Sequence, residues 1–153
     1  MRGEHVVEVT RTFTVGRAPN EVVAYLADFG NATEWDPGTE SCEQTTPGPV
    51  AVGTRWHNVS SVFGLRTELE YELVRVDPDR VVFTGRNDSA DTTDDIAVRQ
   101  GLAPGTSDIT YHAVIDMHGA AKLGAPAAKL AFEKIGHDVE DNLVRILSAE
   151  RQA

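Results

Sequence analysis

The chain has 153 residues, of which 41% are hydrophobic and 25% charged, so it is long enough to bury a core and has the composition of a folded domain. Its 14 basic and 24 acidic residues give a formal net charge of −10, which argues against binding to nucleic acid or to anionic membranes. The only cysteine, Cys42, excludes an internal disulfide and a cysteine metal cage. We therefore expect a single domain over residues 1–153, with no metal and no cofactor.

The amino-terminal residues lack the apolar stretch of a signal peptide, and no run of about 18 apolar residues occurs in the chain. This pattern predicts a cytoplasmic protein without stable membrane insertion. The protein is expected to be a monomer or a homodimer, since an exposed strand edge could pair with a second copy.

The first part of the chain predicts one strand followed by two short helices. Apolar and polar residues alternate over 5–15, which is the period of a half-buried strand. Pro19 opens a helix that we expect to end at Gly30, because proline suits the first helical turn and glycine the end. A second short helix is expected over 31–35, ended by the Asp-Pro-Gly sequence at 36–38.

The middle of the chain predicts further strands joined by turns rich in glycine, proline and acidic residues. They are expected over residues 39–46, 53–63, 65–76, 80–86, 92–100 and 108–117. The clearest is 65–76, where Leu69, Tyr71 and Leu73 alternate with glutamates, as in a sheet that is covered on one face only. Consecutive strands joined by short turns favour an antiparallel sheet.

The end of the chain predicts a long amphipathic helix. Apolar residues recur there at steps of three or four, namely Ala128, Phe132, Ile135, Val139, Leu143 and Ile146. Pro126 is expected to mark either a kink or the start of this helix. Gly136 costs about 1 kcal/mol relative to alanine and is expected to permit close packing or a bend. The order of elements predicts a curved sheet wrapped around this helix, with room for a hydrophobic cavity.

Several local sequences, taken in order, resemble those of a known family. They are Val9–Phe13, Ala18-Pro19, Ala27–Phe29, Glu34–Pro37, Gly48–Thr54 and Val76–Phe83. Together with the closing helix they resemble the START-like superfamily, and more narrowly its bacterial branch of polyketide cyclases/dehydrases and lipid transport, the SRPBCC proteins. The resemblance covers nearly the whole chain. It implies the α+β helix-grip fold: a seven-stranded antiparallel sheet around the C-terminal helix, two short helices between strands 1 and 2, and a cavity between sheet and helix.

The side chains expected to face such a cavity are mostly aromatic. The candidate ligand-binding residues are Trp35, Trp56, Asn58, Tyr71, Phe83, Tyr111 and Phe132. The alternative for each of them is plain core packing. Strand parity allows only one of Trp56 and His57 to face inward, and the sequence leaves open which one does.

The sequence shows no evident set of catalytic or metal-binding residues. Its five histidines lack a histidine or cysteine partner at ligand spacing, and no Gly-x-Ser-x-Gly sequence occurs. The acidic run 87–95 is interpreted as a solvated hairpin, although Asp94 could face the cavity as an acid or base. His112 is expected on the outer face of the sheet, opposite Tyr111. The catalytic residues, if there are any, stay unassigned.

These observations favour a protein that binds a hydrophobic small molecule, lipid-like or polyketide-like, as a carrier or sensor. One alternative implied by the resemblance is a cyclase or aromatase, in which polar residues of the cavity promote aldol cyclisation and dehydration of a polyketide without a metal. Another is a protein-interaction module of a toxin-like pair. A cluster of inward titratable groups with shifted pKa values would favour the enzyme, and the sequence does not reveal one.

Overall fold

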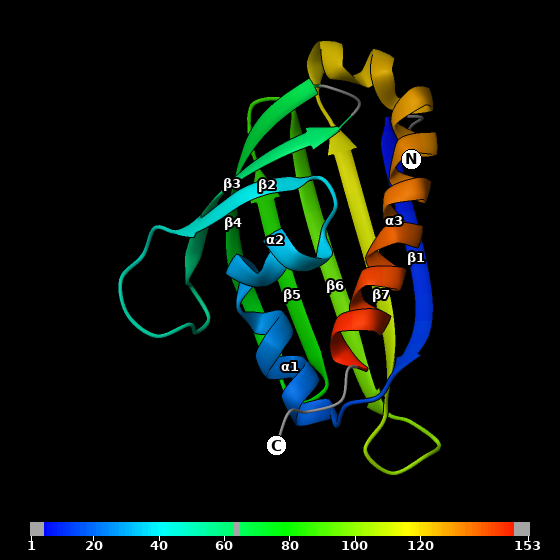
Figure 1. The fold of residues 1–153 in the computed structure, drawn as a ribbon. Coiled ribbons are helices and arrows are strands. Elements are labelled where there is room, and N and C mark those ends of the chain that lie inside the picture. Colours follow the sequence, from blue (N-terminus) through cyan, green and yellow to red (C-terminus); the bar gives the residue numbers. More distant parts are fainter. Residues whose placement is uncertain (1–4, 63–64, 149–153) are drawn as a thin grey trace.

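The computed structural model describes residues 5–62 and 65–148 (Figure 1). Its strands form one antiparallel sheet with the order β1-β7-β6-β5-β4-β3-β2. They are β1 (Val6–Val15), β2 (Thr39–Gln44), β3 (Arg55–Val62), β4 (Leu65–Asp77), β5 (Arg80–Arg86), β6 (Ala90–Gln100) and β7 (Ser107–Met117). Neighbouring strands follow one another in the sequence, except that β1 pairs with β7.

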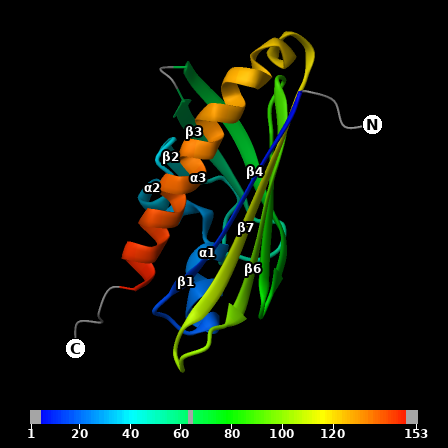
Figure 2. The same ribbon diagram turned by 90° about the vertical axis from the view of Figure 1, so that its right-hand side faces the viewer.

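The helices all lie on one side of this curved sheet. They are α1 (Pro19–Ala27), the 3-10 turn η1 (Phe29–Asn31), α2 (Ala32–Trp35), the 3-10 turn η2 (Gly119–Gly124) and α3 (Ala125–Leu147). The 23-residue α3 crosses one face of the sheet diagonally, as Figures 1 and 2 show. This is the helix-grip arrangement that the sequence predicts. Among the described helices, none is long and apolar enough to cross a membrane.

Two helix boundaries follow from local chemistry. Helix α1 ends at Ala27, before the expected Gly30, because Asp28 is extended and its carboxylate accepts a hydrogen bond of 3.0 Å from the Gly30 amide. This bond begins the 3-10 turn η1 in place of another turn of α1. Pro126 lies in the first turn of α3, where its missing N–H breaks no helical hydrogen bond, so it marks the start of the helix and not a kink.

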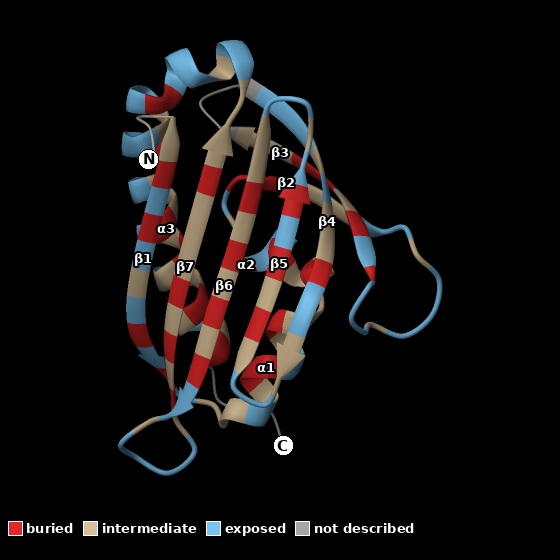
Figure 3. Ribbon diagram, turned by 180° about the vertical axis from the view of Figure 1, so that it is seen from behind, coloured by how far each residue is buried: buried red, intermediate tan, exposed pale blue. Residues whose placement is uncertain are grey.

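The core fills the space between the sheet, α1, α2 and the second half of α3. Alternate residues of the strands are buried, as the banding in Figure 3 shows, and on β1 these are Val7, Val9, Phe13 and Val15. At one end of the core the Phe29 ring lies 4.3 to 6.1 Å, centroid to centroid, from the rings of Trp35, Trp56, Tyr71 and Phe83. Such aromatic pairs contribute about 0.5–1.5 kcal/mol each beyond their buried area.

Helix α3 packs closely against β1 at Gly136. A Cβ atom placed there would lie 2.6 Å from Cγ1 of Val9, which is closer than two carbon atoms can pack. Next to this contact, Arg11 Nε donates a hydrogen bond of 2.9 Å to Glu140 Oε1 on the helix. The glycine therefore serves close packing, the first of the two roles that the sequence allows for it.

Replacing Gly136 by leucine tests this contact. Leucine is the better helix former, yet its side chain must push α3 away from Val9, so we expect Gly136→Leu to lower the free energy of unfolding by about 1–3 kcal/mol. The measurement is the midpoint of urea unfolding. The control is Gly124→Leu, because the Cβ of this exposed residue meets no atom within 4 Å. Equal midpoints for the two variants would contradict the packing role.

Candidate ligand-binding cavity

A cavity of about 120 Å³ lies between the sheet and the first half of α3. Its apolar wall is formed by Phe132 and Ile135 of α3 and by Ala113 and Ile115 of β7. The remaining lining residues come from strands β1, β3, β4, β6 and β7, from the segment after α2 and from helix α3. They are Val9, Asp36, Gly38, Ser60, Thr67, Leu69, Tyr71, Thr92, Asp94, Tyr111, Gly136 and Val139. The cavity thus occupies the place between sheet and helix that the resemblance predicts.

A buried carboxyl group lies in the cavity wall. Asp94, on β6, is only 8% exposed, and its side chain is hydrogen-bonded to Tyr111. Burial, and to a lesser degree the nearby charge of Asp36, raise the pKa of Asp94 to about 7, while the bond to Tyr111 acts in the opposite direction. Near neutral pH this carboxyl group therefore exchanges its proton readily, which is the property of a general acid or base.

The second carboxyl group of the cavity belongs to Asp36, which directly follows α2. Its Oδ1 accepts a hydrogen bond of 3.0 Å from the Gly38 amide, and its Oδ2 accepts one of 3.0 Å from the Thr39 hydroxyl. Burial raises the pKa of Asp36, and the two hydrogen bonds partly oppose that shift. Burial, and to a lesser degree the nearby charge of Asp94, also hold the pKa of both Tyr71 and Tyr111 well above the usual value of a tyrosine.

Tyr71 and Thr92 lie on either side of Gly85 in the sheet. A Cβ atom on Gly85 would lie 2.6 Å from the Thr92 hydroxyl oxygen and 2.7 Å from Cε1 of Tyr71, so only glycine leaves room for both side chains. The Thr92 hydroxyl oxygen is buried and makes no well-aligned hydrogen bond with a described residue, and the neighbouring Tyr71 hydroxyl is the group with which it can pair. Buried hydroxyl groups are normally hydrogen-bonded, so the Tyr71 and Thr92 hydroxyl groups form a polar pair in the cavity wall.

Three of the seven candidate residues line the cavity: Tyr71, Tyr111 and Phe132. The other four lie in the core beside it and are at most 1% exposed, namely Trp35, Trp56, Asn58 and Phe83. Asn58 donates a hydrogen bond of 3.2 Å to the Thr39 hydroxyl and accepts one of 2.6 Å from the Ser60 hydroxyl. Whether any of the seven touches a ligand stays a prediction.

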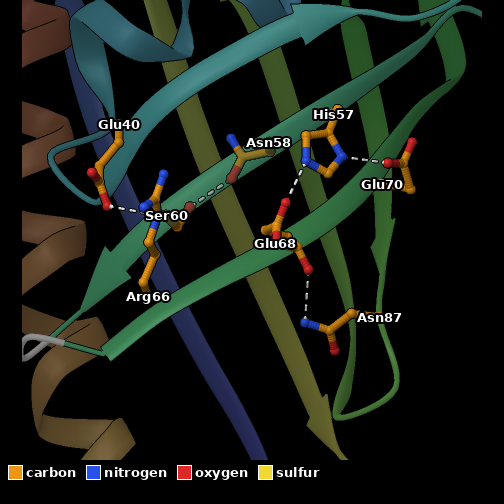
Figure 4. A network of polar contacts seen from close by, with 8 residues as sticks. All are labelled: Glu40, His57, Asn58, Ser60, Arg66, Glu68, Glu70 and Asn87. Atoms are coloured by element: carbon orange, nitrogen blue, oxygen red, sulfur yellow. Dashed lines mark hydrogen bonds and ion pairs between the residues drawn. The ribbon is translucent and has the colours of Figure 1, made fainter.

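Trp56, and not His57, faces inward. The His57 ring lies on the outer face, with Nδ1 2.6 Å from Glu70 Oε1 and Nε2 2.8 Å from Glu68 Oε1 (Figure 4). These two hydrogen bonds, first the one to Glu70, raise the pKa of His57. His112 also lies outside, 3.9 Å from Glu8, and within the described part of the chain no histidine lines the cavity. Among the described residues, no group of three or more histidine, cysteine or acidic side chains could hold a metal ion.

The sequence pattern predicts the inward direction of one of the two cavity carboxyl groups but not of the other. Asp94 has the same strand parity as Ile96 and Val98, which are both buried, so alternation extended back from these residues places it inside. The polar character of 87–95 hides this signal. Asp36 carries no such pattern, because its direction is set by the packing of α2 and by its hydrogen bonds to Gly38 and Thr39.

The strand order, the long helix α3 and the cavity between them make up the START-like helix-grip fold. The family model described as polyketide cyclase / dehydrase and lipid transport matches residues 6–147. The chain therefore belongs to this family. No match was found among curated proteins.

Solved structures share the fold at low sequence identity. A START superfamily protein from Mycobacterium smegmatis is 10% identical with a TM-score of 0.75, and the alignment covers 92% of this chain and 96% of that one. TTHA0849 from Thermus thermophilus is 13% identical with a TM-score of 0.70, covering 91% and 98%. The di-domain ARO/CYC protein BexL from the BE-7585A biosynthetic pathway is 14% identical with a TM-score of 0.68, covering 98% of this chain and 52% of BexL.

The raised pKa of Asp94 predicts a pH-dependent stability. Between the unfolded pKa near 4 and the folded pKa of about 7, the unfolded chain releases a proton that the folded chain keeps, so this residue destabilises the fold as the pH rises through that window. We expect Asp94→Asn, which cannot ionise, to gain about 2–3 kcal/mol of stability relative to wild type between pH 5 and pH 8. Urea midpoints at both pH values measure this gain. The control is Asp88→Asn at an exposed carboxylate. If wild type and Asp94→Asn lose stability in parallel, Asp94 does not hold its proton in the fold.

Proposed function

We propose that the chain is a single ligand-binding domain whose cavity takes up a small, largely apolar molecule with a hydrogen-bonding oxygen, as a carrier or sensor. The observation that carries this proposal is the combination of an apolar wall with buried polar groups that converge on one space. Phe132, Ile135 and Ile115 supply the apolar part, and Tyr71 and Thr92 supply hydroxyl groups. Ligand sites commonly combine these two elements, the apolar part for affinity and the polar part for orientation.

The size of the cavity supports a compact ligand. A dry cavity of about 150 Å³ holds benzene, whereas sites for drug-sized molecules measure about 300–1,000 Å³. At about 120 Å³ the present cavity is somewhat smaller than that benzene site, so a single ring fills it, and a small substituent would extend toward the adjoining surface groove that shares Gly38 and Ile135 with the cavity. A lipid or an extended polyketide would need α3 to move away from the sheet.

The charge of the cavity supports a neutral ligand. The side chains of Asp36 and Asp94 both line the space, and ionisation of either one repels an anion. When Asp94 is protonated it can donate a hydrogen bond, as the tyrosine hydroxyl groups can. A ketone or a similar carbonyl oxygen therefore matches the lining better than a carboxylate does.

Binding of acetophenone and of ethylbenzene tests the proposal, because these molecules have similar shape and differ in the carbonyl oxygen. We expect wild-type protein to bind acetophenone more tightly, and Tyr71→Phe to weaken acetophenone binding about three- to tenfold, since one hydrogen bond is worth roughly 1 kcal/mol, with little effect on ethylbenzene. Titration calorimetry gives both dissociation constants. The control is Glu70→Gln, which changes the neighbouring side chain on the exposed outer face. If neither molecule binds, or if Glu70→Gln has the same effect, the proposal fails.

A second candidate function is aldol cyclisation with dehydration of a short polyketide chain. One observation favours it: Asp94 has a pKa of about 7 and is hydrogen-bonded to Tyr111 beside an apolar space. An ionised Asp94 could remove the proton next to a ketone, while a tyrosine hydroxyl donates a hydrogen bond to the enolate oxygen. The family description and the fold shared with the ARO/CYC protein BexL support the same chemistry.

Incubation with a short linear poly-β-ketone thioester distinguishes the enzyme from the carrier. If the chain is a cyclase, aromatic product forms faster than without protein, and the rate rises with pH through the Asp94 pKa of about 7. Asp94→Asn should then lower kcat by about 10²–10⁴-fold while acetophenone still binds. Absorbance of the aromatic product follows the reaction. If the protein binds acetophenone but product forms only at the uncatalysed rate, the cyclase function is excluded and the carrier function remains.

A further inference from the structure

The lysines of this chain are confined to one short segment. Lys122, Lys129 and Lys134 are the only lysines in the sequence, and all fall within residues 119–134, which we call the Lys–Leu segment. This segment comprises η2 and the first turns of α3 and contains one acidic residue, Glu133, so its formal charge is +2. The whole chain carries −10, so the segment is a basic region on an acidic protein.

The same segment exposes two large apolar side chains. Leu123 is 88% exposed and Leu130 is 71% exposed. On α3, Pro126, Ala127, Leu130 and Lys134 are exposed at helical spacing, which places Leu130 near the middle of the outward face. Figure 1 shows these turns at one end of the molecule, and Figure 3 colours much of them as exposed. Exposed leucines flanked by lysines are the pattern of a helix that lies in a lipid interface.

Two of the three lysines have no ion-pair partner within the described part of the chain. Lys134 pairs with Asp138 at 2.9 Å, whereas no described carboxylate lies within ion-pair distance of Lys122 or Lys129. The long lysine stems can follow an apolar surface while the ammonium groups reach for polar headgroups. The segment can thus offer apolar insertion and positive charge from one face.

The Lys–Leu segment also borders the ligand cavity. A groove of about 290 Å³, lined in part by Leu130, Lys134 and Pro37, lies at this end of the molecule. Gly38 and Ile135 line both this groove and the cavity. The outward side of the first turns of α3 therefore carries the basic and apolar residues, while the inward side closes the cavity.

We propose that the Lys–Leu segment docks on a lipid surface that carries anionic headgroups. Charge complementarity selects this occupant: the free ammonium groups of Lys122 and Lys129 attract anionic lipid, and Leu123 and Leu130 enter the apolar boundary. A symmetric contact with a second copy would bring like-charged lysines together. Two acidic residues lie near the segment and oppose docking: Asp91, which pairs with His118 just before η2, and the exposed Glu133 within the segment itself. The more distant negative charge opposes docking only weakly, because charges more than about 8–10 Å from the surface are screened at physiological salt. Docking does not require the proposed cavity ligand.

Co-sedimentation with vesicles tests this proposal on the full chain without ligand. We expect binding to vesicles of phosphatidylcholine with about 30% phosphatidylglycerol, at least tenfold weaker binding to phosphatidylcholine alone, and loss of binding at high salt. Reversal of two charges in Lys122→Glu/Lys129→Glu should weaken binding more than tenfold, since each lysine near such a surface contributes about fivefold. Leu130→Ser should weaken it severalfold.

The matched controls lie at the opposite end of the sheet, by the turn between β6 and β7 (Figure 1). Leu102→Ser removes a fully exposed leucine there, and Arg99→Glu reverses an exposed charge. Both should bind vesicles as wild type does, and all variants should keep the wild-type circular dichroism spectrum. Absence of binding to anionic vesicles, or equal losses in segment and control variants, overturns the proposal. So does self-association without vesicles that Leu130→Ser abolishes, because a second copy would then cover the leucines.

Discussion

The structure depends on how α3 is held against the sheet, and it is held mainly through its second half. Val139, Leu143 and Leu147 are buried in the core cluster, and the contact between Gly136 and Val9 brings helix and strand together just before them. The first half of α3 buries mainly alanines, Ala125 and Ala131, and contributes half-buried Phe132 and Ile135 to the cavity wall. A cavity persists beneath this half because tight packing elsewhere fixes the position of the helix without filling the space under its first turns.

The carboxyl group of Asp94 occupies a position that packing alone would give to an apolar residue. Ile96 and Val98 follow it on the same face of β6 and are buried in the core. Burial of a carboxyl group costs free energy unless the group is neutral or hydrogen-bonded, and Asp94 meets both conditions, through its raised pKa and through Tyr111. The buried carboxyl group, with its cost in folding free energy, lies at the cavity and not in the aromatic core around Phe29. This distribution matches a site whose polarity serves a bound molecule.

Periodicity predicted the fold well because it reports which face of an element is buried. The alternation of Leu69, Tyr71 and Leu73 with glutamates indicated the correct inward face of β4, and strand parity correctly placed His112 outside. Periodicity could not separate core from cavity, because both need inward side chains. For this reason Trp56 and Phe83 share the expected direction with Tyr71 and yet lie in the packed core.

The cavity carboxyl groups mark the limit of prediction from local pattern. Asp94 lies in a run of polar residues that resembles a solvated hairpin, and its inward direction follows only when the register of β6 is fixed by Ile96. The inward direction of Asp36 depends on tertiary contacts that no periodic pattern reveals. Helix α2 packs against β2, and the Thr39 hydroxyl donates a hydrogen bond to the Asp36 carboxylate. The raised pKa values arise mainly from burial of the two carboxyl groups and, for Asp94, also from the nearby charge of Asp36, so they are properties of the tertiary structure and of neither strand nor helix alone.

The first turns of α3 connect the cavity to the surface of the molecule. Phe132 and Ile135 close the cavity from inside, while Leu130 and Lys134 face the groove outside, so a displacement of these turns changes both at once. Such a displacement leaves the anchored second half, from Val139 to Leu147, in the core. A surface that binds the first turns of α3 more tightly in their displaced position than in their closed position shifts the equilibrium toward an open cavity. The size of that shift is limited by the difference between the two affinities. A cavity that now matches a single ring could in this way admit a larger molecule without any change in the sheet.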